Sequence, residues 1–273
     1  MAVRHLLITV CIATGSNVAA QTGGAANSIG YTQIGAYQKH PQQALAFNAN
    51  QGALAQYTTF AATAYGEKRF LLDDLSLLQI GLVLPVQGGA FGLQASSFGS
   101  AAYSENKLGL AYGRHLGSKV ALGVLFKYEH FTISGYGNRG TVSAAMGLLL
   151  HLSENVIAGL HVYNPTGSRL GRLKEAPLPQ RFSAGLGYTP YDALYISTTI
   201  VKEMYQPLSL QAGLQYRVLN QLQVTAGVAT ATSAVYFGAG YTKASLTIDA
   251  VAGWHPHLGI SPGLMVTYNK KQE

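Results

Sequence analysis

The sequence predicts an all-β fold, a 14-stranded antiparallel transmembrane β-barrel with a short N-terminal plug segment. Three observations lead to this prediction. Apolar residues alternate with small or polar residues along most of the chain, charged residues are scarce, and the first 20 residues have the pattern of an export signal. An exported chain whose strands carry one broad apolar face is typical of a barrel in a bacterial outer membrane.

The alternation is clearest in the hairpin from Leu108 to Phe131. One face of its second arm is apolar and ends in aromatic residues: Val120, Leu122, Val124, Phe126 and Tyr128. The opposite face is small or charged, apart from one leucine: Ala121, Gly123, Leu125, Lys127 and Glu129. A period of two indicates a strand. The contrast between the two faces predicts lipid outside the barrel and a lumen of small or polar residues inside it.

The same alternation extends over residues 57–268, which we predict to be the barrel domain, with a polar tail at residues 269–273. The expected strands are Tyr57–Tyr65, Leu75–Val86, Gly89–Phe98, Lys107–Leu116, Val120–Thr132, Val142–Leu152, Val156–Tyr163, Arg181–Tyr188, Ala193–Lys202, Leu208–Val218, Leu222–Ala229, Val235–Thr242, Leu246–Trp254 and Ile260–Tyr268. Most are long enough to cross a membrane as tilted strands, which takes about 9 to 11 residues. The connections are expected to alternate between tight turns, such as Gln87-Gly88, and longer loops, such as 133–141 and 164–180.

The first 20 residues are predicted to be a signal peptide that is cleaved before Gln21. Arg4 precedes a short apolar run, and Val18-Ala19-Ala20 supplies small residues before the cleavage site. The run is too short for a membrane-spanning helix, which needs roughly 20 apolar residues. Cys11, the single cysteine, lies inside this segment, so the mature chain is expected to contain no disulfide and no cysteine-bound metal. The predicted location is the outer membrane of a Gram-negative bacterium.

Charge and composition narrow the expected partners. Charged residues make up 11% of the chain, against about 25% in soluble proteins. The net charge is +7, but no basic run is interleaved with aromatic residues, which argues against a nucleic-acid partner. We therefore expect contact with outer-membrane lipid and lipopolysaccharide.

Two sets of residues follow from the parity of the strands. Aromatic residues near the strand ends on the outer face are predicted to form girdles at the lipid head groups: Tyr112, Tyr128, Tyr188, Tyr216, Tyr241, Trp254 and Tyr268. Polar residues on the inner face are predicted to line the lumen: Lys127, Glu129, Gln211, Gln215, Arg217 and Asp249. Accordingly, arginine at the outward positions Leu122 or Leu210 should destabilise the barrel far more than arginine at the inward positions Gly123 or Gln211.

Residues 21–56 precede the barrel and form the predicted periplasmic or plug segment. Pro41 and the residues after it favour a short helix that Gly52 would interrupt. The mixture of apolar and amide side chains favours a segment folded into the lumen over one that hangs below it. The expected plug residues are Phe47, Asn48, Asn50, Gly52 and Leu54.

No motif for catalysis, cofactor binding or metal binding stands out. Gly135 to Gly140 formally match G-x-G-x-x-G, but they lie in a predicted hairpin without the helix that would hold a phosphate. The inward histidines His115, His151 and His161 are expected to be solvated in the lumen and not to ligate a metal. A hydrolase would need a serine within hydrogen-bond reach of His115 or His151.

The segment ALAFNANQGALA, at residues 44–55, resembles the N-terminal signature of the FadL-like superfamily, particularly its PorV/PorQ-type members. Tyr163-Asn164-Pro165 and the segment around Asp249 resemble later parts of the same group. The resemblance implies a fourteen-stranded outer-membrane barrel with an inward N-terminal segment. It further implies a non-enzymatic role in type IX secretion or surface protein assembly, through secretion-system proteins or secreted cargo. The alternative is a FadL-like channel for uptake of hydrophobic compounds, which needs an apolar pocket beside the plug that the sequence pattern does not indicate.

Overall fold

The computed structural model describes residues 30–170 and 176–271. The predicted signal peptide and residues 21–29 of the predicted plug segment therefore lie outside the described residues. Among the described residues, no helix has the length and apolar character needed to cross a membrane.

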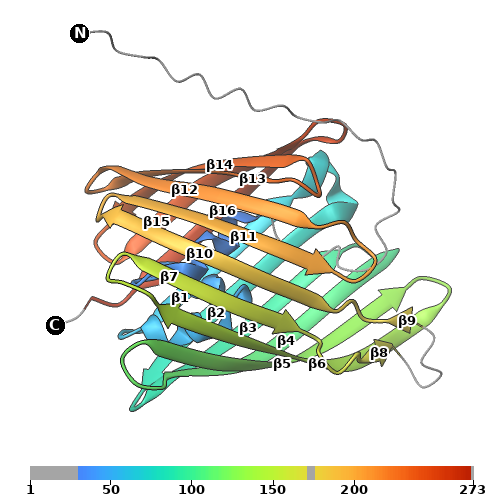
Figure 1. Cartoon of the computed structure of the whole chain (residues 1–273). Coiled ribbons are helices and arrows are strands. Elements are labelled where there is room, and N and C mark those ends of the chain that lie inside the picture. Colours follow the sequence, from blue (N-terminus) through green and yellow to red (C-terminus); the bar gives the residue numbers. More distant parts are fainter. Residues whose placement is uncertain (1–29, 171–175, 272–273) are drawn as a thin grey trace, which may run out of the picture.

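A closed barrel of 14 antiparallel strands forms the molecule (Figure 1). The barrel strands are β1 (Ala61–Lys68), β2 (Ser76–Val86), β3 (Gly89–Gly99), β4 (Tyr103–His115), β5 (Val120–Ile133), β6 (Gly137–His151), β7 (Val156–Tyr163), β10 (Arg181–Tyr191), β11 (Leu194–Glu203), β12 (Ser209–Leu219), β13 (Leu222–Ala229), β14 (Ala234–Lys243), β15 (Leu246–His255) and β16 (Gly259–Asn269). Each strand pairs with its neighbours in the chain, and β7 pairs with β10 because β8 (Arg169–Leu170) and β9 (Ala176–Pro177) form a separate ribbon. The pairing of β1 with β16 closes the barrel, which confirms the predicted fold class.

The first strand begins later than predicted. Tyr57 still belongs to the preceding helical segment, because its backbone N–H caps that segment at Leu54 and its hydroxyl donates to the carbonyl of Gln43 at 2.5 Å. Strand β1 therefore starts at Ala61 and continues to Lys68, beyond the predicted end at Tyr65.

The loops differ less between the two rims than predicted. One rim holds the start of β1 and the end of β16, and we call it the short-turn rim. Its connections are tight, as at residues 87–88, 220–221 and 244–245. The opposite rim, called the long-loop rim, carries the 164–180 connection but also a turn of residues 134–136 where a loop over 133–141 was expected. Strands β5 and β6 extend into that region because Gly135 and Gly137 adopt positive φ angles of 80° and 86°, which close a tight turn.

Short 3-10 helices before β1 lie inside the barrel, as the blue segments of Figure 1 show. They are η1 (Gly30–Tyr37), η2 (Ala44–Asn48) and η3 (Gln51–Gln56), and they are called the plug below. Two further turns, η4 (Arg69–Leu71) and η5 (Asp73–Leu75), lie in the connection from β1 to β2.

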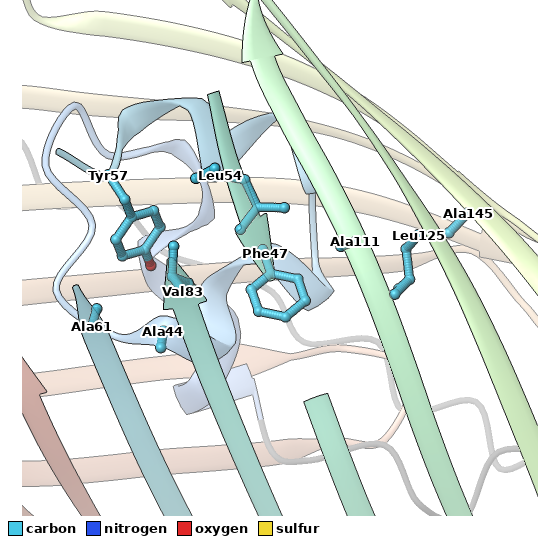
Figure 2. Packing of buried hydrophobic residues seen from close by; sticks show 10 residues of the cluster. Ala44, Phe47, Leu54, Tyr57, Ala61, Val83, Ala111, Leu125 and Ala145 are labelled. Carbon is cyan, nitrogen blue, oxygen red and sulfur yellow. The ribbon is translucent and has the colours of Figure 1, made fainter. Parts of the chain in front are cut away.

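The outer wall is apolar, and the plug covers part of the inner wall. Leu108 and Phe126 point outward with 60% and 62% of their surface exposed, whereas Leu125, the exception in the sequence pattern, is 1% exposed. Leu125 belongs to a buried cluster with Phe47 and Leu54 of the plug (Figure 2). It therefore breaks the alternation because it packs against the plug and not against lipid.

Candidate functional site: the plug and the lumen cavity

The plug lies on a part of the lumen wall where several inward positions are glycine. A Cβ atom added at Gly123 of β5 would lie 2.2 Å from the carbonyl oxygen of Gln51, and one at Gly147 of β6 would lie 2.3 Å from Oδ1 of Asn50. Real Cβ atoms cannot approach so closely, so glycine is required for the plug backbone to reach the wall. Part of the high glycine content of the chain is thus explained by this contact.

Asn50 fastens the plug to two strands. Its Oδ1 accepts a hydrogen bond from the N–H of Gly52 at 3.0 Å, which caps η3. Its Nδ2 donates to the carbonyls of Leu148 in β6 and Leu160 in β7, both at 3.1 Å. Among the predicted plug residues, Phe47, Asn50, Gly52 and Leu54 are buried, and Asn48 is half-buried.

A chain of hydrogen bonds connects both ends of η1 to the wall. Gln38, just after η1, donates to Gln215 at 2.8 Å; Gln215 donates to Gln223 at 3.0 Å; and Gln223 donates to Oδ1 of Asp249 at 2.9 Å. The hydroxyl of Tyr31, at the start of η1, donates to the same Oδ1 at 3.0 Å. Burial and the neighbouring Asp249 raise the pKa of the Tyr31 hydroxyl, so Tyr31 remains a donor.

Charged side chains cross-link β4 to β7 on the lumen side. Lys107 lies between two buried carboxylates, 2.9 Å from Glu105 and 3.5 Å from Glu129. Glu129 also accepts hydrogen bonds from Ser143, at 2.6 Å, and from Tyr163. Nζ of Lys127 lies 5.1 Å from the centre of the Tyr163 ring, in cation-π geometry.

A cavity of about 370 Å³ lies between η1 and the wall formed mainly by β10 to β15. It reaches the long-loop rim, where Pro207, Thr232 and Leu258 line it. Ile34, Tyr37 and Tyr236 provide apolar and aromatic lining near the plug. Hydroxyl and amide side chains from the wall complete the lining: Ser183, Ser197, Thr199, Ser209 and Gln211.

The two arginines that line the cavity each form an ion pair with a glutamate of the protein. The Arg181 guanidinium lies 2.6 Å from the carboxylate of Glu203, and the Arg69 guanidinium lies 2.9 Å from that of Glu67. Each arginine thus faces a carboxylate of the protein itself.

A second hollow, of about 330 Å³, opens at the short-turn rim. Arg217, predicted as a lumen residue, lines this hollow together with Lys270 and is exposed. The other predicted lumen residues separate into three places. Gln211 lines the cavity, Gln215 and Asp249 belong to the chain that holds η1, and Lys127 and Glu129 belong to the charged cross-link.

The predicted girdle residues lie on the outer wall. All of these side chains are exposed except Tyr112, which is half-buried against Phe91: Tyr112, Tyr128, Tyr188, Tyr216, Tyr241, Trp254 and Tyr268. Trp254 also borders the cavity at the long-loop rim. Sequence reasoning did not identify His161, Tyr37 or Tyr236 as cavity residues, because their proximity depends on strands far apart in the chain.

The structure brings two predicted lumen histidines together. The rings of His115 and His151 have centres 5.8 Å apart, and His151 interacts with the amide of Gln56 and the carbonyl of Lys119. No group of three histidine, cysteine or acidic side chains suited to a metal ion occurs within residues 30–170 and 176–271.

Comparisons with known proteins give fold neighbours only. No protein-family model and no curated protein matches the sequence. The structure is similar to that of a Pseudomonas aeruginosa FadL homologue, with a TM-score of 0.62 and 13% identity over 92% of this chain and 99% of the other. The Pseudomonas putida toluene transporter TodX gives a TM-score of 0.62 and 11% identity over 92% of this chain and 98% of the other. The CymD monoaromatic hydrocarbon channel gives 0.59 and 10% identity over 84% and 93% of the two chains. The chain therefore has the closed 14-strand fold of the FadL-like outer-membrane barrels.

Proposed function

We propose that this chain is an outer-membrane barrel that admits small hydrophobic compounds through its lumen. The observation that carries the proposal is the cavity of about 370 Å³ between η1 and the wall. Its volume lies within the usual range of small-molecule sites, about 300 to 1,000 Å³. The alternation along the strands does not reveal this pocket, because its lining is assembled from distant strands.

The proteins of similar structure support this class of function. TodX is a toluene transporter and CymD is a monoaromatic hydrocarbon channel, and both share the fold of this chain. The proposal thus takes the uptake channel, which the sequence analysis treated as the alternative, as the leading function. A role of PorV/PorQ type in type IX secretion, with secretion proteins or cargo as partners, remains a prediction from the resemblance in sequence.

The outer wall supports the proposed location. Its exposed leucine, phenylalanine and tyrosine side chains match a surface bathed in lipid and lipopolysaccharide. Compounds entering from the long-loop rim would reach η1 first, and η1 would have to move before they passed to the short-turn rim. In this proposal the protein conducts and does not catalyse.

The uptake of radiolabelled naphthalene by bacteria with and without the gene tests the proposal. Ser183 lines the cavity, so Ser183→Trp should fill much of it and reduce uptake to the level of cells that lack the gene. The matched control is Phe182→Trp, because Phe182 is adjacent in β10 and points outward with 54% of its surface exposed. Unchanged uptake by a folded Ser183→Trp barrel, shown by its heat-dependent gel mobility, would contradict the proposed route.

A further inference from the structure

Two buried polar atoms next to the cavity have no hydrogen-bond partner among the described residues. They are Nε2 of His161 and Oδ1 of Asn48, and both residues line the cavity. His161 is 8% exposed, so water reaches it poorly. Buried polar groups are rarely left unpaired in folded proteins, because the lost hydration is then uncompensated. Two such atoms at one cavity point to a ligand that supplies the missing hydrogen bonds.

Both atoms belong to the β7 end of the cavity. Asn50 donates to the carbonyl of Leu160 at 3.1 Å, which fixes the link between η2 and η3 beside β7. Asn48 lies two residues before Asn50, and His161 directly follows Leu160 on the lumen face. The plug and the wall thus each supply one polar group to the same region.

The chemistry of these groups selects a hydroxyl. An amide oxygen accepts hydrogen bonds, while Nε2 of a neutral imidazole donates or accepts according to its tautomer. A hydroxyl group both donates and accepts, so it satisfies His161 and Asn48 together in either orientation of the amide. A hydrocarbon would leave both groups unpaired.

The charges around the cavity disfavour an anion. Arg181 and Arg69 are already paired with Glu203 and Glu67. Arg181 is paired with Glu203, Lys107 lies between Glu105 and Glu129, and Lys127 belongs to the same cross-link beside Tyr163. A carboxylate that entered would lose its hydration and would have to compete with the carboxylates of the protein for these cations.

The rest of the lining suits an aromatic ring. Ile34, Tyr37 and Tyr236 offer apolar and aromatic surface, against which rings pack in offset or edge-on geometry. A dry cavity of about 150 Å³ is known to hold benzene, so about 370 Å³ has room for a compound with one or two rings. We propose that the cavity binds small neutral phenols, whose hydroxyl docks on His161 and Asn48. This inference rests on the proposed function and narrows its substrate class.

Equilibrium dialysis of the purified, detergent-solubilised barrel tests the inference, with empty micelles as the blank. The probes are labelled p-cresol, p-xylene and p-toluate, which differ in one substituent. We expect p-cresol to bind roughly tenfold more tightly than p-xylene, as one to two net hydrogen bonds would give. We expect p-toluate to bind most weakly.

Substitutions then show whether His161 and Asn48 cause the preference for p-cresol over p-xylene. His161→Leu and Asn48→Leu should each weaken p-cresol binding by roughly fivefold to tenfold and leave p-xylene binding unchanged. His161→Gln, which keeps a hydrogen-bonding group, should restore part of the p-cresol affinity. The matched control is Gln79→Leu, because Gln79 of β2 has a buried unpaired Oε1 that lies away from the cavity.

Four results would each overturn the phenol site. The first is that p-xylene binds as tightly as p-cresol, and the second is that p-toluate binds most tightly. The third is that His161→Leu weakens p-cresol and p-xylene binding equally, and the fourth is that none of the three probes binds. Naphthalene uptake that depends on Ser183 would then still support the conduit, so the two proposals fail separately.

Discussion

Single residues decide how the plug meets the wall, and Gly123 is the clearest case. Its inward orientation was predicted from the alternation, and arginine there was expected to cost much less stability than arginine at the outward position Leu122. That expectation is wrong, because the carbonyl of Gln51 occupies the place where a side chain would begin. The sequence shows which face a residue lies on but not what fills the space in front of it.

We expect Gly123→Ala to destabilise the barrel by about 1 to 3 kcal/mol, the usual cost of overpacking a tight contact. The matched control is Gly66→Ala in β1, where no atom lies within 4 Å of the added Cβ, so the free energy of unfolding should change little. Urea unfolding followed by the fluorescence of Trp254, the single tryptophan, measures both. Equal stability of the two variants would show that the plug does not press on Gly123.

Leu125 and His161 illustrate the same limit on prediction. Leu125 was recognised as an exception without a reason, since its partners Phe47 and Leu54 lie far away in the sequence. His161 was expected to be solvated in the lumen, yet its Nε2 is buried. The alternation along a strand predicts whether a side chain faces the lumen or the lipid. Its burial depends on which segment of the chain enters the lumen and where that segment ends.

Among the structural elements, η1 has the most consequence for passage through the barrel. Residues of η1 line the cavity, and the hydroxyl of Tyr31 in η1 donates to Asp249, which also accepts a hydrogen bond from Gln223. Asp249 is 1% exposed, and no ion pair to it occurs among the described residues. Hydrogen bonds, and not an ion pair, therefore connect η1 to Asp249.

Asp249→Leu should release η1, because it removes both hydrogen bonds, worth about 3 kcal/mol together when the acceptor is charged. The population of open barrels should rise by about two orders of magnitude, which single-channel recording in planar bilayers would detect as new conductance. Asp249→Asn keeps an acceptor oxygen and should resemble the unaltered protein. A closed Asp249→Leu barrel would show that other contacts hold η1.

The strands themselves were well predicted, since each must alternate between lipid and lumen along its whole length. The errors lie at the ends, where the alternation has no physical cause. Tyr57 was assigned to a strand although it caps η3, and residues 137–141 were assigned to a loop although they extend β6. Outside the membrane, pairing between neighbouring strands continues without the apolar pattern that would reveal it.

At the scale of the whole molecule, the stability of the barrel depends on contact between its outer wall and lipid. Leu210 points outward from β12 with 44% of its surface exposed, and Gln211 points into the cavity. Leu210→Arg should destabilise the barrel by about 2 to 4 kcal/mol if the site lies near the bilayer midplane. Gln211→Arg should cost much less, because the cavity has space for a longer side chain.

Urea unfolding in phospholipid vesicles compares these two variants. A similar loss of stability for Leu210→Arg and Gln211→Arg would contradict a lipid-facing outer wall. Gln211 is the suitable inward position, because the carbonyl of Gln51 leaves no space for a side chain at Gly123.

The fold of the molecule was predictable and its function was not. Period-two alternation and the scarcity of charge are imposed by the membrane on every strand, so both are visible in one sequence. The cavity instead requires Ile34 of the plug, Ser183 of β10 and Tyr236 of β14 to meet. Short motifs favoured a secretion-associated barrel, whereas the assembled cavity favours a conduit.

The glycine-lined wall has one further consequence. Strands with glycine at many inward positions cannot fill the space that they enclose. The plug fills that space with side chains of its own, including the fully buried Phe47 and Leu54. The interior packing of this barrel thus comes from a segment that precedes its strands. A shortened chain that began at β1 would keep the strand pairing and lose this packing, which would leave an unfilled tube.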